Sequence, residues 1–187
     1  PDEFHFWHIF RSFLLWEQDR EYTKEQQRSL YSRGGLYYEL HENYGKALEY
    51  YSKSGEKEKV SELLIKATRY HPGMGHYEEM ESYYSSLPDT LIKENPSLMQ
   101  AKSMLCALHA DYDGSERWYR ELEEFAAVRK KSDAAAKEVR SRLTWLNIAL
   151  PQRGVTGLAD TIKTAFRLIM DKEMSLPSFS VTSTLPS

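Results

Sequence analysis

An aromatic pattern that occurs three times constrains the fold of this chain more than any other feature. Each copy consists of one aromatic residue, five intervening residues and then two adjacent aromatic residues. The copies begin at Tyr44, Tyr77 and Tyr112, so they are separated by 33 and 35 residues. Self-similarity at a period of this length is typical of proteins in which each unit stacks on the next. The pattern therefore predicts a repeat protein.

Small and aromatic residues around the first copy suit two closely packed helices. Gly35 and Tyr38 fall on the first expected helix, and Ala47 and Tyr51 fall on the second. Small residues let two helix backbones approach, and the rings fill the space beside them. This order and period resemble the 34-residue tetratricopeptide repeat. We therefore predict an all-α fold, namely a tetratricopeptide-like α-solenoid of antiparallel helix pairs.

Helix-start and helix-stop signals divide the chain into predicted elements and domains. Thr23 and Gln26 have the spacing of a capping box, and Ser54-Gly55 is typical of a helix end. We predict an N-terminal helix in residues 1–22, a repeat domain in 23–174 and a Ser/Thr/Pro-rich linker or extension in 175–187. Within the repeat domain, the expected helices cover residues 24–43, 45–54, 56–70, 76–87, 96–111, 114–131, 133–149 and 156–171.

The N-terminal helix has an unusual composition. Nine of the thirteen residues in 4–16 are apolar, and most of these are aromatic or leucine. A helix that is apolar nearly all round is normally buried on more than one side. We therefore expect the first repeat to cover one side of this helix.

Composition excludes several classes of protein. The 187 residues are 41% hydrophobic and 28% charged, with a net charge of −3, which is ordinary for a soluble domain and gives no footprint for direct nucleic-acid binding. No apolar run approaches the roughly 18–20 residues that cross a membrane. The lone Cys106 excludes an internal disulfide and fits a reducing compartment. We predict a cytoplasmic protein without a membrane partner.

The sequence carries no enzyme motif, because phosphate-binding loops, zinc-protease helices and nucleophile elbows are all missing. His5 and His8 could hold a metal, but helix-surface histidines are the favoured interpretation since no third ligand lies nearby in sequence. His71 and His76 flank a Gly-rich turn and could have a metal or catalytic role, but ordinary exposed histidines are the favoured interpretation. Cys106 lies in an apolar stretch and is expected to be a buried structural thiol. We predict that the chain is not an enzyme and has no catalytic residue, metal or cofactor.

A cluster of basic residues could contact phosphates. Asp133 and Glu138 dilute the cluster, so a solvated helix face is the favoured interpretation. The basic residues are Arg129, Lys130, Lys131, Lys137, Arg140 and Arg142.

Three segments carry a resemblance to a known family. Residues 4–14 (FHFWHIFRSFL) and 30–38 (LYSRGGLYY) resemble one junction in the LuxR-type ATP-dependent large transcriptional regulators, and residues 47–51 (ALEYY) are similar to the first superhelical hairpin of that family. The resemblance covers about residues 4–70. It implies that residues 1–22 end a winged-helix segment. It also implies an effector-sensing superhelix whose nucleotide-binding and DNA-binding domains are absent from this chain.

Two interpretations of function remain open. In the first, the chain is the sensing and relay domain of a bacterial LuxR-type regulator. In the second, it is a protein-docking scaffold of the tetratricopeptide type, since solenoid folds serve both uses. The corresponding partners are a small-molecule inducer, a protein partner, other domains of the same regulator, or a second copy of the chain.

Candidate ligand-binding residues follow from a loop and from the expected groove. Residues 151–157 form a long loop with Arg153, whose guanidinium suits carboxylate or phosphate. Trp145 and Trp118 could form the walls of a pocket beside it, although core tryptophans and a solvated arginine are the favoured alternative. The candidates that line the expected groove are Leu36, Glu39 and Met104.

Overall fold

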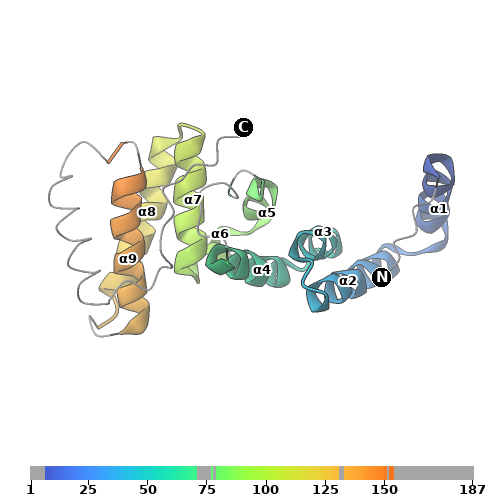
Figure 1. The fold of residues 1–187 in the computed structure, drawn as a ribbon, viewed down its shortest axis with the longest axis horizontal. Helices are drawn as coiled ribbons and strands as arrows, with labels where there is room; N and C mark the ends of the chain where they lie inside the picture. The colour runs from blue at the N-terminus through green and yellow to red at the C-terminus, as the bar shows by residue number, and fades with distance from the viewer. Residues whose placement is uncertain (1–6, 71–76, 78, 131–132, 151, 154–187) are drawn as a thin grey trace. The chain divides into compact units, whose positions relative to one another are not determined.

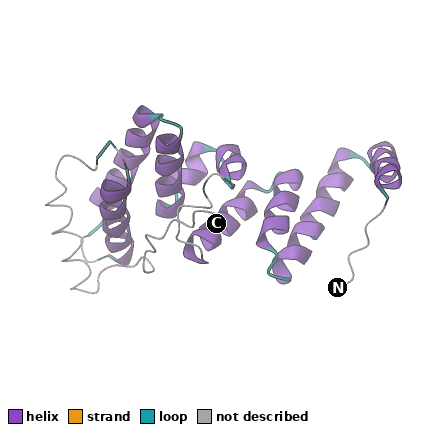
Figure 2. Cartoon of the chain, turned by 45° about the horizontal axis from the view of Figure 1, so that its top comes forward, coloured by secondary structure: helices purple, strands orange, loops and turns teal. Residues whose placement is uncertain are grey.

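A computed structural model describes residues 7–70, 77, 79–130, 133–150 and 152–153. These residues form helices and connecting turns without any strand, as Figure 2 shows, which confirms the all-α prediction for this part of the chain. The chain divides into two compact units, Pro1–Val60 and Ser61–Ser187. The domain boundaries predicted at residues 22 and 174 stay predictions. None of the described helices has both the length and the hydropathy that a bilayer crossing requires.

The described residues of the first unit form three complete helices and the start of a fourth (Figure 1). These are α1 (His8–Glu21), α2 (Lys24–Leu40), α3 (Tyr44–Ser54) and the first residues of α4 (Lys57–Tyr70). The second unit contains the rest of α4 together with α5 (Glu81–Ser86), α6 (Asp89–Lys93), α7 (Pro96–Leu108), α8 (Tyr112–Ala127) and α9 (Ala134–Ala149).

The packing predicted between α2 and α3 is present. Ala47 and Tyr51 are buried, and a Cβ atom added to Gly35 would lie only 2.6 Å from Cδ1 of Tyr51. The Tyr51 hydroxyl donates a hydrogen bond to Oε2 of Glu39 at 2.8 Å. Lys46 Nζ lies over the Tyr38 ring at 5.1 Å from its centroid. Glycine at position 35 therefore permits the close approach that brings the Tyr51 ring against α2.

The α7–α8 pair repeats this arrangement with serines at the small-residue positions. Ser103 and Ser115 are fully buried, and Ser103 Oγ donates to the Ser115 carbonyl at 3.0 Å. Each serine is 68 residues after its counterpart, Gly35 or Ala47, which is two periods of 34. The small residues are therefore in register between the two helix pairs.

The turns that close these two pairs also match. Glu42 and Ala110 each follow a helix end and each have φ 58°, which is the left-handed conformation. The next residues, Asn43 and Asp111, accept hydrogen bonds from the backbone N–H groups of Lys46 at 3.2 Å and of Gly114 at 2.9 Å. The same three-residue turn thus occurs twice, again 68 residues apart.

The second copy of the aromatic pattern departs from the prediction of one helix over residues 76–87. Among the described residues the helix is α5, which begins only at Glu81. Leu87 is extended because it precedes Pro88, and a further short helix, α6, then begins at Asp89. No helix signal in the sequence predicts α6. The predicted helix over 156–171 lies outside the described residues.

Helix α7 is the centre of the second unit, and it contacts α5, α6, α8 and α9. It begins at Pro96, which follows the N-cap Asn95 and is favoured in a first turn. It is buried on most sides, so its sequence is apolar with few charges. Its buried residues are Pro96, Ser97, Leu98, Met99, Gln100, Ala101, Ser103, Met104 and Leu105.

The expectation that α1 is buried on more than one side is wrong for the structure described. Trp7 is 83% exposed and Trp16 is 56% exposed, and the apolar residues between them are exposed as well. Hydrogen bonds join α1 to α2 only where the two helices meet: the buried Gln27 amide donates to the carbonyls of Gln18 at 3.4 Å and of Tyr22 at 3.2 Å. Such an attachment holds the end of α1 without covering its sides.

Candidate functional site

The residues that follow α9 and one side of α8 form a polar cluster around the predicted site residue Arg153. Arg153 follows α9, and its backbone N–H donates to the Leu150 carbonyl at 3.0 Å. Arg153 Nε donates to Glu116 Oε1 at 2.7 Å, and a second guanidinium nitrogen forms an ion pair with the other carboxylate oxygen. The guanidinium also lies over the Tyr119 ring, with Cζ 3.4 Å from the centroid. Fork-to-carboxylate pairing and ring stacking together suit arginine and not lysine.

The remaining groups of this cluster connect α8 and α9. Arg153 also donates to Asn147 Oδ1 at 3.3 Å. Burial raises the pKa of the Tyr119 hydroxyl, while a hydrogen bond with Asn147 and the charge of Arg153 act in the opposite direction. Gln152 Nε2 donates to Ser115 Oγ at 3.1 Å, and its buried Oε1 atom has no hydrogen-bond partner among the described residues. Arg153 is therefore occupied by groups of this chain and is not a solvated loop charge.

The other predicted site residues lie in two different environments. Trp118 and Trp145 are 1% and 8% exposed, and Met104 is also buried, so all three belong to the core of the second unit. Leu36 and Glu39 are in the first unit, on α2. The structure thus brings Arg153 to α8, whereas the two tryptophans are covered and do not form the walls of an open pocket in the described residues.

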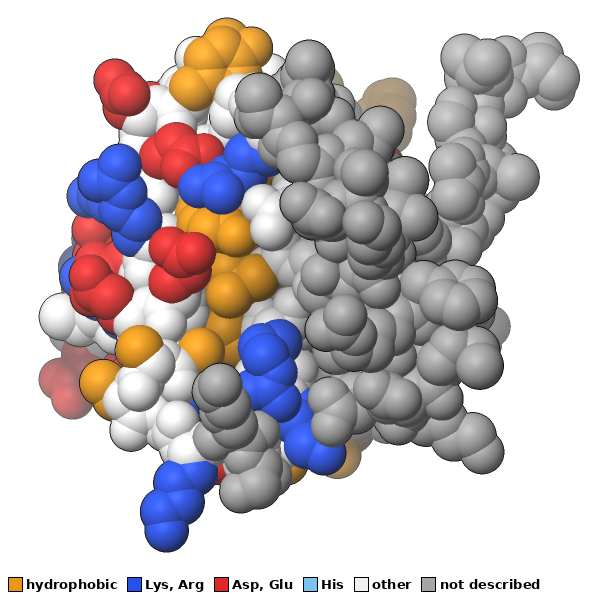
Figure 3. Space-filling view, turned by 90° about the vertical axis from the view of Figure 1, so that its left-hand side faces the viewer, with side chains coloured by type: hydrophobic (Ala, Val, Ile, Leu, Met, Phe, Trp, Pro, Cys, Tyr) orange, Lys and Arg blue, Asp and Glu red, His pale blue; other side chains and the backbone are white. Residues whose placement is uncertain are grey.

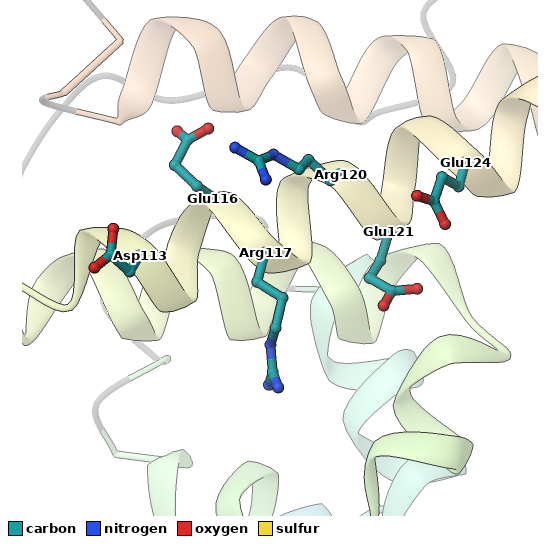
Figure 4. A pocket seen from close by; sticks show the side chains of 6 residues that line it. All are labelled: Asp113, Glu116, Arg117, Arg120, Glu121 and Glu124. Atoms are coloured by element: carbon teal, nitrogen blue, oxygen red, sulfur yellow. The ribbon is translucent and has the colours of Figure 1, made fainter.

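Charged side chains of α8 border a hollow of about 340 Å³. Figure 4 shows Glu116 and Arg120 pointing toward α9, while Arg117 and Glu121 point to the opposite side. Several of these charges are paired within the second unit: Arg117 with Asp89 at 3.4 Å, and Glu121 with Lys93. Small-molecule sites are mainly apolar with a few polar groups, so this hollow is a charged surface and not such a site. The lining residues are Asp113, Glu116, Arg117, Arg120, Glu121 and Glu124.

The basic cluster predicted to be a solvated face contains one exception. Arg142 is buried, and it donates to Gln100 Oε1 at 2.5 Å and to Glu138 Oε1 at 2.6 and 3.0 Å. Burial raises the pKa values of the nearby Tyr84 and Tyr77 hydroxyls, and the positive charge of Arg142 opposes that rise. The interpretation of Arg142 as a solvated residue is therefore wrong. Its i,i+4 spacing from Glu138 was the only sequence signal for this network.

Elsewhere the face that carries α8 and α9 shows no single sign of charge. Figure 3 shows acidic and basic side chains interspersed over the described part of this face, with hydrophobic ones between them. Such a mixture differs from the continuous basic surface that phosphate backbones require.

The outer face of α2 is exposed and largely apolar. Leu36 is 51% exposed and Leu40 is 74% exposed, and they are one turn apart. Leu30 and Tyr37 are also exposed, and the charged Arg33 lies between them in the sequence. Gly35, in contrast, is on the side that packs against α3. We call Leu30, Arg33, Leu36, Tyr37 and Leu40 the outer α2 face.

The described residues hold no group of three His, Cys, Asp or Glu side chains that could bind a metal ion. His5, His71 and His76 lie outside those residues. Cys106 is half-buried, and both its burial and the nearby Asp111 raise the pKa of its thiol, which disfavours the reactive thiolate.

The pairing between Arg153 and Glu116 makes a first testable prediction. A double-mutant cycle with Arg153→Ala and Glu116→Gln should give a coupling energy of about 1 kcal/mol, because the pair is bidentate but partly exposed. The measurement is urea unfolding of the two single variants and the double variant. The coupling should fall at high salt. Additive effects of the two substitutions would show that the pair contributes nothing to stability.

Comparison with known proteins adds no relative: no protein-family model, no curated protein and no solved structure matches this chain.

Proposed function

We propose that this chain is the signal-receiving helical-repeat domain of a LuxR-type transcriptional regulator, and that it receives a protein segment on the outer α2 face. The resemblance of residues 4–70 to these regulators supplies the biological setting. The observation that carries the binding mode is the exposed apolar surface around Leu36 and Leu40. An apolar helix surface without a covering element is typical of sites where a partner docks.

The repeated packing supports a tetratricopeptide-like α-solenoid as the scaffold. Gly35 and Ala47 in one pair correspond to Ser103 and Ser115 in the other. The turn of each pair also contains a residue in the left-handed conformation at the equivalent position. Repeats of this kind place equivalent helices along one side of the array, where they offer an extended surface to a ligand. In this proposal α2 and α7 are equivalent first helices.

The residues of the outer α2 face suggest the chemistry of the partner. Leucines at positions 36 and 40 can hold apolar anchors that are spaced by one helical turn. Arg33 would favour an acidic residue next to those anchors. The proposed partner is therefore a short amphipathic segment with an apolar stripe and an acidic flank.

A small-molecule inducer is the second candidate, and one observation favours it. Arg153 already holds a carboxylate in a bidentate arrangement, that of Glu116. A ligand with a carboxylate or phosphate group could replace Glu116 at the same guanidinium. Such a ligand would have to break the existing pair, which makes this candidate the less favoured.

The two candidates are separated by paired variants. We expect Leu36→Asp with Leu40→Asp to reduce retention of a protein partner from source-cell extract at least tenfold, because the charges oppose burial of apolar anchors. Val128→Asp is the matched control, since Val128 is 81% exposed and lies at the end of α8. Retained proteins are quantified by mass spectrometry.

A second measurement gives the result that would contradict the docking proposal. The low-mass filtrate of the same extract is added to the chain in a thermal-shift assay. Stabilisation by that filtrate that disappears in Arg153→Ala, together with equal protein retention by all variants, would replace the docking proposal by the inducer proposal.

A further inference from the structure

One buried hydrogen bond joins α7 to α9 in the core of the second unit. Arg142 Nη1 donates to Gln100 Oε1 at 2.5 Å, and both side chains are buried. The guanidinium also donates to Glu138 Oε1, but Glu138 belongs to α9 itself, so that bond moves with the helix. The bond to Gln100 ties one helix to the other, and we call it the α7–α9 bond.

A buried charge of this kind adds little net stability to a core. Taking a guanidinium out of water has a large desolvation cost, which the new hydrogen bonds only offset. Apolar residues of similar volume in the same place are often as stabilising as the charged group. Removing one partner alone is costly, because the other is then buried without a bond. The α7–α9 bond therefore calls for a role other than stability.

The apolar residues of α9 do not fix the position of this helix along its own axis. Ala136, Val139, Leu143 and Leu146 follow one another at three- and four-residue steps, and Leu150 continues the line. All of these side chains are buried except that of Leu143, which is half-buried. Such a line repeats after every turn, so a slide of α9 by one turn, about 5.4 Å, would again place apolar residues against the same neighbours.

The α7–α9 bond, in contrast, does not repeat. Four residues to either side of Gln100 on α7 are Pro96 and Met104, which are buried and have no side-chain oxygen to accept a bond from the guanidinium. The residues of α9 that a slide would bring to Gln100 are Glu138 and Leu146, and neither donates to its oxygen. A slide would thus leave buried polar groups unpaired. A single buried polar residue specifies the register of coiled coils by the same mechanism.

We propose that the α7–α9 bond sets the axial register of α9, that is, its position along α7. The proposal does not depend on the outer α2 face, because all of its groups belong to the second unit. It has a consequence for the residues that follow α9. A slide by one turn would carry Arg153 away from Glu116 and from the Tyr119 ring, which it contacts in the observed register.

Two spin labels in the full 187-residue chain measure this register. Leu108 ends α7 and Ala134 begins α9, with the whole of α8 between them in the chain, so a slide of α9 changes their separation. Both residues are exposed. Each is replaced by a spin-labelled cysteine in a Cys106→Ser background, and the distance distribution is measured by double electron–electron resonance. We expect a single narrow distance for this parent chain.

Arg142→Met combined with Gln100→Leu removes the α7–α9 bond and keeps the core apolar. We expect a second distance, which differs from the first by about 5 Å, in at least a tenth of the molecules. The urea midpoint should stay close to that of the parent chain, because both partners of the bond are replaced together. Circular dichroism verifies the helical content.

Thr144→Val is the matched control. Thr144 is also buried on α9, but its hydroxyl donates to the Arg140 carbonyl within the same helix at 2.9 Å. This variant should keep the single distance of the parent chain.

A double variant that lost its helical content would be replaced by Gln100→Leu alone, which removes the α7–α9 bond and leaves Arg142 paired with Glu138. The same second distance is expected there. One unchanged narrow distance in a folded variant without the α7–α9 bond would overturn the proposal. So would two distances in the parent chain, or a second distance in Thr144→Val.

Discussion

Replacing Tyr51 with alanine is expected to lower the free energy of unfolding by about 3–5 kcal/mol, because it leaves a cavity where an aromatic ring is buried between α2 and α3. Tyr51 is only 2% exposed, and the space opposite its ring is that of Gly35, which has no side chain to fill the cavity. The loss is measured by urea unfolding followed by circular dichroism.

Two further variants separate the causes of this effect. Tyr51→Phe keeps the ring but removes the hydrogen bond to Glu39, so it should cost about 1 kcal/mol. Tyr37→Ala removes a ring of similar size that is 46% exposed, and the loss should stay below about 1 kcal/mol. If Tyr51→Ala and Tyr37→Ala had equal effects, the register between α2 and α3 would be wrong.

Replacing Arg142 with alanine should cost about 2–3 kcal/mol, because it leaves a cavity and removes the partner of the buried Gln100 carbonyl. The loss of unfolding free energy would be larger if Glu138, the acidic partner of Arg142, were completely buried. The Glu138 side chain, however, is 34% exposed, so water can solvate its carboxylate once the arginine is gone. The measurement is again urea unfolding, with the emission of the buried Trp118 and Trp145 as a local probe.

The matched control for this prediction is another arginine of the second unit. Arg120 is exposed on α8, so Arg120→Ala should change stability by less than about 0.5 kcal/mol. Arg142→Met keeps most of the side-chain volume and should recover part of the lost stability. If the Arg142→Ala and Arg120→Ala variants were equally stable, Arg142 would contribute no more to stability than a solvated arginine.

The sequence predicted those features of the fold that depend on local signals. The capping box at Thr23 and the glycine end at Gly55 both occur as predicted, and the helix start at Pro96 does as well. Local signals failed around α5 and α6. There Leu87 had to be extended before Pro88, and the five-residue α6 is too short for a hydrophobic period to reveal it.

The candidate sites depended on contacts between distant residues, which spacing alone does not show. The long loop after α9 points to Arg153, but its partner Glu116 lies 37 residues earlier in the sequence. The burial of Arg142 cannot be read from its basic neighbours, because its partner Gln100 is 42 residues away and gives no local signal. The exposure of α1 was not foreseen either, because an apolar helix sequence does not say which surface covers it.

The two matching turns also bear on the order in which the chain folds. Each joins helices whose contacting residues, such as Gly35 and Tyr51 or Ser103 and Ser115, are close in sequence. Closing so short a segment costs little chain entropy, so both hairpins can form early, within the microsecond range of local structure. The contact between Gln100 and Arg142 joins residues that are 42 apart, so the chain entropy lost in forming it is larger. In the second unit we therefore expect the α7–α8 hairpin to form first and α9 to dock on it afterwards.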